Sequence, residues 1–599
     1  MGKLSLFCWV ALGLMVARGF AAPAQDSDAT LENLFRKSLD DTLRLRPLEA
    51  TRLGDHRYDA FLENLTAPSR AVWLDQTRRT LADLPTRVPY QSLSRNSQVN
   101  YEIWQHHLAF EIWREENLHP YDEDPLLYEE YLFDSVRLLL TDSPLPLETN
   151  VANCLSRMSV LNRVVAAARA NLRNPSRLAT ETAIQQNRAA IEFYQHEILA
   201  RAGRTRQLPA LNEAAARAAA QLREYQRFLE TDLLPRSNSD WRAGPDHFGR
   251  IIDQELGAGL TADQLNANAE AEFSRVSRQV YEYSRHLWPL YYPGFPLPPD
   301  DEPGRLTTIQ DVLQGISRQR TPPDSIRSLL MSRVASQRQF IRQDRFLTIG
   351  PSDRLQEALA PEIDRGGAVL LLSQSPPLEN KHSLKLSISP PPRSWDSNHV
   401  TIFMAANNTT VLELLSMREA YPGMAAQAEA AFNQKSLIRL VLASKAYKEG
   451  WVDYSTGEML DEGYKSSDLP LKFEQLRWYL QSIGHALIDH RLHCGATTDN
   501  EALDFLTRQC FEPPAEATQS ILRAKLYPGV SSAAFAGRAA FYQLRQDIAR
   551  QLGNKFQLGA FHNALLSTGP VPVRYLPELA KLALGLEQRS EGRGPRGPR

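Results

Sequence analysis

The strongest constraint on the fold of this chain is the helical spacing of its apolar residues, which recurs along most of its length. In residues 29–47 apolar side chains return at intervals of three and four positions. Residues 180–203 and 208–235 are rich in alanine, arginine, glutamate, glutamine and leucine, which all favour helices. The sequence therefore predicts a mostly α-helical protein, with one large helical domain over residues 25–585.

One segment departs from this helical pattern. Leu384, Leu386 and Ile388 alternate with polar residues, which is typical of a half-buried strand. Three prolines follow, and the chain is then apolar again over residues 400–404. We interpret the segment as a short hairpin or pair of edge strands, a small β element just before a helix that starts near Val411.

The two ends of the chain read as segments outside the helical domain. Lys3 precedes a short apolar run from Leu4 to Val16, and Ala22-Pro23-Ala24 fits a small-x-small cleavage site. These features predict a signal peptide over residues 1–24 and a periplasmic or extracellular location; an uncleaved anchor is the alternative. Residues 586–599 are dominated by glycine, proline and arginine, which predicts a disordered tail.

The charge balance argues against two classes of partner. The chain has 68 basic and 70 acidic residues, a net charge of −2. Such a balance offers no electrostatic attraction to nucleic acid or to an anionic membrane surface. No run after the signal is long and apolar enough to cross a membrane. We therefore expect no nucleic-acid partner and no integral membrane segment after signal removal.

Three cysteines follow the signal, namely Cys154, Cys494 and Cys510. Export permits a disulfide, and Cys494 and Cys510 are the closer pair in sequence. Their spacing matches no zinc motif. Scattered thiols are more often small buried apolar residues, which is the interpretation we favour.

The most unusual segment runs from Met417 to Gln427 and reads M-R-E-A-Y-P-G-M-A-A-Q. It resembles the H-E-x-x-P-G-H-H-x-Q segment of the domain-of-unknown-function 885 family, whose members are regarded as zinc peptidases. The positions that match are Glu419, Pro422, Gly423 and Gln427. The three histidine positions hold Arg418, Met424 and Ala425.

Five further segments are similar to this family and keep its order along the chain. The segment 47–59 resembles P-x-x-A-T-x-x-G-x-x-x-Y-D, and 449–454 resembles E-G-W-x-x-Y. The segment 489–493 matches D-x-x-x-H. Residues 523–530 are similar to R-Y-x-x-x-P-G-Q, with alanine and valine in place of the tyrosine and glutamine. Phe561-His562 resembles the start of the closing motif. The resemblance implies a helical peptidase fold with a deep cleft.

In the family's pattern the motif histidines bind zinc, which lowers the pKa of a bound water. Carried over by position, Glu419 is the base, Glu449 a surviving ligand and His493 a donor near the oxyanion. Arginine, methionine and alanine at the histidine positions cannot replace the lost ligands at neutral pH. We therefore expect these catalytic residues to be vestigial and the protein to hold no metal or other cofactor.

A relocated metal is an alternative that the sequence leaves open. His485, His490 and His493 lie in one helical stretch, and the last two share a face. With Glu449 or Asp489 they could form a small site of nitrogen and oxygen ligands. Other catalytic classes lack support, because the chain has no G-x-S-x-G elbow and no phosphate-binding glycine-rich loop.

These observations favour an exported pseudo-peptidase that binds a peptide or another protein in its cleft. An active hydrolase with a displaced or non-standard metal and a structural envelope protein are the alternatives. The residues predicted to line the cleft are Arg418, Glu449, Tyr421, Tyr454, Asp489 and Arg523.

The charge at position 418 leads to a more specific expectation. Carboxylates that have lost a metal repel one another, and a guanidinium can relieve this with charge-assisted hydrogen bonds. We therefore predict that Arg418 lies beside Glu419 and Glu449 in place of the missing cation. We also predict a helix from about Val411 to Gln434, disturbed around Tyr421-Pro422-Gly423 because proline lacks a donor.

Overall fold

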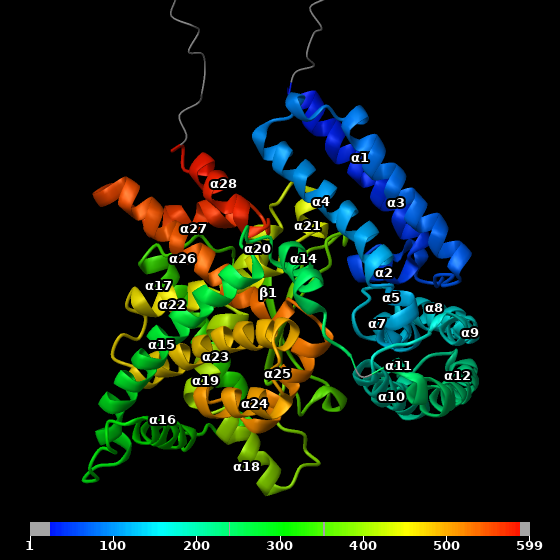
Figure 1. Cartoon of the computed structure of the whole chain (residues 1–599). Coiled ribbons are helices and arrows are strands. Elements are labelled where there is room, and N and C mark those ends of the chain that lie inside the picture. Colours follow the sequence, from blue (N-terminus) through cyan, green and yellow to red (C-terminus); the bar gives the residue numbers. More distant parts are fainter. Residues whose placement is uncertain (1–23, 239, 352–353, 587–599) are drawn as a thin grey trace, which may run out of the picture.

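The structure, a computed structural model, describes residues 24–238, 240–351 and 354–586. The predicted signal peptide over residues 1–24 and the predicted tail over residues 586–599 lie outside this range, except for Ala24 and Leu586. The described chain is mostly helical, as predicted, and contains three short strands. Figure 1 shows the helices in three groups.

The first group contains three long helices that slope together at the upper right of Figure 1: α1 (Ala24–Leu45), α3 (Ala67–Arg87) and α4 (Arg95–Asn117). The second group is a bundle of shorter helices below them: α2 (Pro47–Leu53), α5 (Pro120–Glu123), α6 (Pro125–Glu129), α7 (Ser135–Thr141), α8 (Leu147–Met158), α9 (Leu161–Asn171), α10 (Arg177–Glu192), α11 (Ile198–Ala202), α12 (Leu208–Phe228) and α13 (Leu234–Arg236). The helices predicted over residues 29–47 lie in the first group, and those predicted over 180–203 and 208–235 lie in the second.

The third and largest group holds the remaining elements: α14 (Gly244–Leu256), α15 (Ala262–Tyr291), α16 (Glu302–Ser317), α17 (Ile326–Gln343), β1 (Leu355–Leu359), β2 (Leu370–Gln374), β3 (Leu384–Ile388), α18 (Ser397–Ala406), α19 (Thr409–Glu419), α20 (Met424–Ala431), α21 (Leu437–Val441), α22 (Lys445–Asp461), α23 (Leu469–Cys494), α24 (Asp499–Asp504), α25 (Pro514–Leu526), α26 (Ala533–Leu552), α27 (Leu558–Ser567) and α28 (Leu576–Ala583). Helices α22 and α23 cross its centre (Figure 1).

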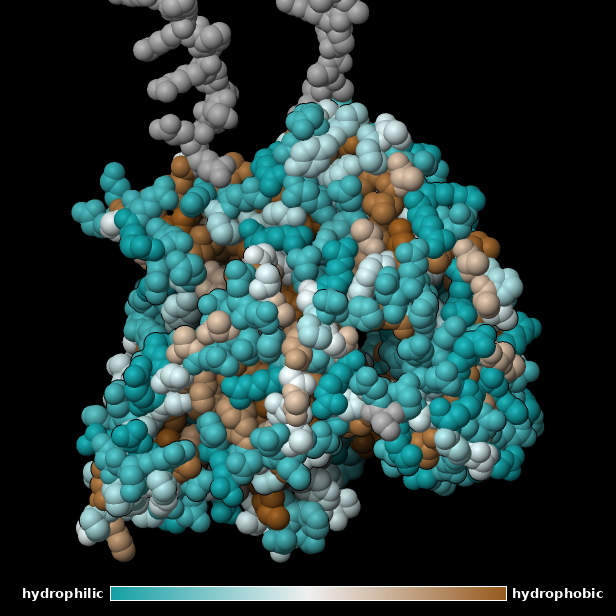
Figure 2. All heavy atoms as spheres, in the orientation of Figure 1, coloured by the Kyte–Doolittle hydropathy of each residue, from teal (hydrophilic) through white to brown (hydrophobic). Residues whose placement is uncertain are grey.

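Two hydrophobic cores lie within these groups. The smaller core belongs to the bundle of α2 and α5–α13. The larger core combines α1, α3 and α4 with the third group, so the first helices of the chain pack with its C-terminal half. Figure 2 shows a mostly polar face that is hollowed between the bundle and the largest group. Among the described residues, no helix combines the length and the apolar character needed to cross a membrane.

The three strands form a small sheet in the order β1-β3-β2, with β3 parallel to β1 and antiparallel to β2. The predicted strand at Leu384–Ile388 is confirmed, and its alternating apolar side chains are buried. The strand predicted over residues 400–404 is wrong, because these residues belong to α18. Asp396 caps that helix by accepting from the backbone N–H of His399 at 2.9 Å, a local signal that outweighs the apolar run.

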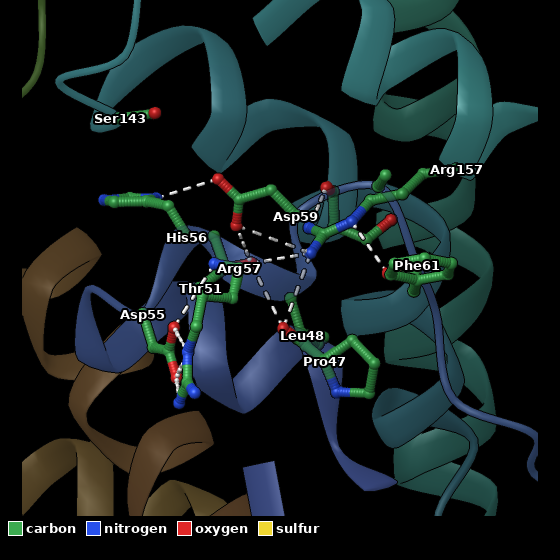
Figure 3. A network of polar contacts seen from close by, with 12 residues as sticks. Pro47, Leu48, Thr51, Asp55, His56, Arg57, Asp59, Phe61, Ser143 and Arg157 are labelled. Carbon is green, nitrogen blue, oxygen red and sulfur yellow. Dashed lines mark hydrogen bonds and ion pairs between the residues drawn. The ribbon is translucent and has the colours of Figure 1, made fainter. Parts of the chain in front are cut away.

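The N-terminal motif at residues 47–59 forms a polar network inside the smaller bundle (Figure 3). Arg157 is fully buried; its Nη2 donates to Thr51 Oγ1 at 2.6 Å and its Nε to the Phe61 carbonyl at 3.0 Å. Thr51 in turn donates to Asp59 at 2.6 Å. Backbone carbonyls bind most of the buried guanidinium, so the motif holds the chain around Pro47 and Phe61 in a fixed position.

His56 connects the same motif to the sheet region. Its two ring nitrogens lie 2.8 Å from Asp59 and 2.6 Å from Glu379, in the loop between β2 and β3. The hydrogen bond to Asp59, together with Glu379, raises the pKa of His56 to about 9. A protonated imidazole between two carboxylates therefore joins the small bundle to the largest group.

Helices α22 and α26 pass each other at two glycines. A Cβ atom on Gly537 would lie 1.8 Å from the carbonyl oxygen of Ala446, and one on Gly450 would lie 2.4 Å from Gly537. Any larger residue would push the helices apart. Gly450 of the E-G-W segment is thus explained by helix packing.

The three cysteines outside the predicted signal are free thiols. Cys154 and Cys510 are buried, and Cys494 is half-buried, in line with the interpretation of these residues as small packing side chains. Cys510 packs directly against Gly484 of α23, where a Cβ would come within 2.4 Å of its sulfur.

Candidate functional site

The helix predicted over residues 411–434 is two helices separated by a break at Ala420–Gly423. Asn408 caps α19, since its side chain accepts from Thr410 N and Val411 N, both at 3.1 Å. At the break, a Cβ on Gly423 would lie 2.0 Å from the Arg418 carbonyl oxygen, so glycine is required there. The predicted disturbance is confirmed, and α20 ends at Ala431 rather than near Gln434.

The tryptophan of the E-G-W segment binds this break. Trp451 on α22 is fully buried, and its Nε1 donates to the carbonyl oxygen of Pro422 at 3.0 Å. Gln427 on α20 donates to the Lys448 carbonyl at 3.4 Å. The close crossing of α22 and α26 at Gly450 brings α22 into position for these contacts. The segments 417–427 and 449–454 thus together build one corner of the fold.

Arg418 leaves the end of α19 and forms an ion pair with Asp453 on α22. Asp453 is 3% exposed, and its other carboxylate oxygen accepts from Ser482 Oγ of α23 at 2.7 Å. The Arg418 guanidinium also lies over the ring of Trp478, 5.4 Å from its centre. The arginine is therefore held by a carboxylate and an indole from two different helices.

A second arginine approaches Asp453 from α26. Arg538 is buried, donates to the Asp453 carbonyl and lies 3.7 Å from the ring centre of Tyr479. Burial by itself favours the neutral form of Asp453, but the charges of Arg418 and Arg538 outweigh it and hold the pKa of this carboxyl below its usual value. Asp453 is therefore an anion between two cations.

Glu419 faces the sheet. Its Oε2 accepts from the backbone N–H of Leu372 in β2 at 2.8 Å. Burial raises the pKa of Glu419, and the nearby Glu449 adds to this effect, against the hydrogen bond from Leu372 and the charge of Arg418. Arg418 therefore acts on Glu419 through its charge. Its ion pair, however, is with Asp453, and the predicted partner Glu449 is exposed on α22.

A pocket of about 240 Å³ opens beside this corner, between the end of β2 and helices α20 and α22. Gln374 at the end of β2, Gln427 of α20 and Lys448 of α22 supply its polar groups. His382 and Phe432 form a stacked pair on its wall, with ring centres 4.8 Å apart. The pocket offers hydrogen-bond donors, a positive charge and an aromatic surface.

Tyr421 and Tyr454, two of the predicted cleft residues, are fully buried. Tyr421 donates to Glu429, whose other oxygen accepts from Gly350 N at 2.6 Å. Tyr454 donates to His562 at 2.9 Å, and the other ring nitrogen of that histidine binds the Phe346 carbonyl at 2.8 Å. Burial lowers the pKa of His562 to about 3, so it is neutral. Both tyrosines join segments of the core.

Asp489 and His493 also lie in the interior. Asp489 accepts from Gly529 N at 3.1 Å and from Ser532 Oγ at 2.7 Å, which fixes the turn after α25. His493 binds the Ala524 carbonyl through Nε2 at 2.9 Å and the Ala243 N–H through Nδ1 at 3.2 Å. His493 lies about three turns along α23 from Ser482. The structure therefore places it apart from Arg418 and Glu419.

Arg523 is exposed on α25, and its side chain makes no hydrogen bond with any residue that the structure describes. The histidines of the alternative metal site point to different partners: His485 to Glu512 and His490 to Asp263, both at 3.0 Å. Within the described ranges, no three side chains of histidine, cysteine, aspartate or glutamate are grouped in a way that fits a metal ion.

Several residues of this corner were missed by sequence reasoning. Asp453 is one turn after Glu449 in the E-G-W segment, and this spacing places both on the same side of a helix, which was an available signal. Trp478, Ser482 and Lys448 carry no motif, and only the tertiary arrangement brings them to the site.

Three comparisons place the chain among known proteins. A family model described as "Bacterial protein of unknown function (DUF885)" matches residues 47–579. A structure from Shewanella oneidensis, of a protein proposed to be a lipoprotein and of unknown function, is similar at 24% identity and a TM-score of 0.80, over 92% of this chain and 99% of that one. A proposed lipoprotein from Colwellia psychrerythraea has 17% identity and a TM-score of 0.72, over 94% and 100%. At these identities the two structures share the fold. No curated protein matches the chain.

Proposed function

Since the chain belongs to the DUF885 family, whose description assigns no activity, we propose a function from the corner around Arg418 and β2. We propose that the protein is exported and binds an extended peptide segment along the free edge of β2, without hydrolysing it. The observation that carries this proposal is that the outer edge of β2 runs past Glu419 and ends at the pocket that Gln374 lines.

The pairing of β2 shows which backbone groups are free. Leu370, Leu372 and Gln374 face Ile388, Leu386 and Leu384 of β3. The backbone of Ser375 is bonded to β3 through the Ser383 carbonyl at 3.0 Å, so the residues that alternate with it turn their N–H and C=O groups outward. Glu419 binds the outward N–H of Leu372. The outward groups at Gln374 remain for a peptide, which would add a strand to the sheet.

The residues around Arg418 support binding rather than zinc-dependent hydrolysis. The zinc that the family resemblance implies needs neutral histidines or anionic ligands. The positions in question hold a guanidinium already paired with Asp453, the thioether of Met424 and the methyl group of Ala425. A fixed cation beside Glu419 would repel a divalent ion by several kcal/mol at short range. These residues do not fit a zinc site.

Export is supported by the apolar run Leu4–Val16 and the small residues Ala22-Pro23-Ala24 that follow it. The two similar solved proteins are themselves proposed lipoproteins, which is a statement about those proteins. Fractionation of cells that produce the full chain tests the location, with the N-terminal residue of the mature protein determined by mass spectrometry.

A pair of variants at one position tests peptide binding. Gln374→Pro removes the outward N–H without taking a hydrogen bond from the β2–β3 ladder, whereas Gln374→Ala keeps it. Both are compared with the unaltered protein on an array of ten-residue peptides of varied sequence. We expect the alanine variant to retain the peptides that the unaltered protein binds, and the proline variant to lose them.

Three outcomes would contradict the proposal. Equal binding of peptides by the proline variant and the unaltered protein would exclude the β2 edge. Cleavage of a bound peptide, with a rate that falls in Glu419→Gln, would favour the alternative of an active hydrolase. A folded protein that binds no peptide on the array would favour the structural envelope protein.

A further inference from the structure

A second cavity lies in the N-terminal part of the molecule, away from the corner around Arg418. It has a volume of about 460 Å³ and lies where α1 turns into α2, against the start of α3 and the loop 58–65. Leu65 and Tyr121 on its wall belong to the smaller hydrophobic core. A neighbouring cavity of about 730 Å³ shares residues 61–65 with it. Cavities that combine apolar and aromatic walls with a few polar groups are common places for small-molecule sites.

The notable group in this cavity is Arg46. Its guanidinium lies over the ring of Trp73, 5.1 Å from the centre. Its contact with Glu111 is 4.0 Å long, beyond hydrogen-bond distance, and its side chain is 26% exposed. Among the described residues none accepts a hydrogen bond from this guanidinium. The N–H groups of a stacked arginine thus remain available to a ligand in the cavity.

Arg70 adds a second positive charge to the same wall. It lies over Tyr121, 4.6 Å from the ring centre, and reaches the half-exposed Asp122 at 3.3 Å. Phe61 stands at the cavity with 59% of its surface exposed, an unusual exposure for a phenylalanine. The cavity therefore combines two cations with aromatic rings. One of these rings, that of Phe61, is largely exposed.

The carboxyl group in this cavity does not cancel the two cations. Glu63 accepts from Leu48 N at 3.0 Å through Oε1, while its Oε2 is buried without a partner. Burial raises the pKa of Glu63 to about 7, against the charge of Arg46. At neutral pH a large fraction of Glu63 is thus uncharged, and the cavity keeps a net positive charge.

The polar network of the N-terminal motif fixes two walls of the cavity. Arg157 donates to the carbonyl oxygens of Phe61 at 3.0 Å and Pro47 at 3.4 Å, so the two chain segments that flank the cavity are fixed by one buried side chain (Figure 3). A site whose walls are fixed before binding loses little entropy when a ligand enters.

We propose that this cavity is a second binding site, for a small organic anion that carries a carboxylate or phosphate group on an aromatic or apolar body. The anionic group binds the free N–H groups of Arg46, with Arg70 nearby, and the body packs against Phe61 and the ring of Tyr58. The site is independent of peptide binding at β2.

Calorimetry with four probes tests the proposal on the full-length protein: phenyl phosphate, benzoate, inorganic phosphate and benzyl alcohol. We expect phenyl phosphate or benzoate to bind with a dissociation constant of about 1 mM or tighter, and the other two probes to bind at least several-fold more weakly. The comparison of phenyl phosphate with benzoate shows which anionic group the site prefers.

Two variants locate the binding. Arg46→Gln should weaken the preferred probe about tenfold or more, whereas Arg188→Gln, an exposed arginine on α10, should not. Phe61→Ala alters an exposed side chain, so we expect this variant to fold normally. It should weaken the binding of the two ring-bearing anions but not that of inorganic phosphate. The proposal is overturned if neither anion binds, or if both Arg46→Gln and Phe61→Ala bind it as tightly as the unaltered protein.

Discussion

The two halves of α23 differ in what their side chains contact. In the first half, which we take to end at Ser482, Trp478 lies under Arg418 and Ser482 donates to Asp453, so the helix supports charges at a partly exposed corner. In the second half, Asp489 and His493 are buried and bind the backbone of neighbouring segments. The family resemblance would place Asp489 and His493 of the second half in one site with Arg418 and Glu419, which lie beside the first half.

This difference separates residues that shape the fold from those that can meet a ligand. Asp489 and His493 join α23 to the turn after α25 and to the segment before α14, where no ligand is needed to explain them. Arg418 is partly exposed, and Glu419 binds the outer edge of β2, which ends at the pocket lined by Gln374. A motif read from sequence therefore contains both kinds of residue, and burial with satisfied hydrogen bonds distinguishes them.

The largest change is expected in zinc binding at the corner around Arg418, beside the first half of α23. We expect the purified protein to contain well under one zinc per chain. The triple variant Arg418→His, Met424→His, Ala425→His should bind zinc several orders of magnitude more tightly, because it restores nitrogen ligands beside Glu449. Elemental analysis and a zinc titration measure this. About one equivalent of zinc in the unaltered protein that survives Glu449→Ala would refute the argument.

The next largest effect concerns the ion pair at this corner. Arg418→Ala leaves Asp453 buried with only Arg538 to balance it, and should lower the free energy of unfolding by about 3–5 kcal/mol in urea denaturation. Adding Asp453→Asn should recover part of the loss. The exposed pair Arg508–Asp504 serves as a control, since Arg508→Ala should cost no more than about 1 kcal/mol. A loss as small as that of the control would mean that the pair is not buried in solution.

At the second half we expect an effect on stability alone. His493→Ala removes two hydrogen bonds to backbone groups and should lower the free energy of unfolding by about 2–3 kcal/mol. Peptide binding by the folded variant should be unchanged, because His493 lies far along α23 from the β2 edge. If the variant is as stable as the unaltered protein but loses peptide binding, the contrast between the two halves is wrong.

The smallest effect, expressed per pH unit, is a pH dependence that originates at Asp489. Burial raises the pKa of Asp489 from 3.8 to about 7 in the folded protein. The folded state therefore holds a proton that the unfolded state releases, so this contribution to stability is complete below about pH 4 and is lost as the pH rises through about 7. The slope is at most about 1.4 kcal/mol per pH unit for one proton.

Urea denaturation at a series of pH values compares Asp489→Asn with the unaltered protein. The asparagine keeps an oxygen that can accept from Gly529 or Ser532 but does not titrate, so the difference in stability between the two proteins should change with pH over this range. A constant difference would show that Asp489 is ionised in the folded state.

Helices could be predicted from the sequence wherever the local signal was strong. The apolar spacing in residues 29–47 and the helix formers in 180–203 and 208–235 gave the correct elements. The alternation at Leu384–Ile388 gave the correct strand. The apolar run at residues 400–404 led to a wrong prediction of a strand, because its length suits a strand. The cap at Asp396 instead starts a helix there. The predicted deep cleft has not been established by the fold.

The partners of the site residues could not be predicted in the same way. Arg418 was expected beside Glu449, and helical spacing made Asp453 equally available from the same helix. Glu449 and Asp453 share one face of α22, but Glu449 lies one turn nearer the start of the helix and is exposed, whereas Asp453 is buried against α19, α23 and α26. The burial of Asp453 depends on residues of three other helices, which no local pattern in α22 contains.

Several contacts of the first helices have a consequence for the order of folding. Arg95 of α4 binds Glu578 at 2.8 Å, and Glu32 of α1 accepts from Ser436 at 2.6 Å, partners that are 483 and 404 residues away in sequence. While the chain is being synthesised, the first helices leave the ribosome long before these partners exist. Their final packing has to wait until almost the whole chain has been made. The part of the protein that is made first is thus among the last to be locked in place.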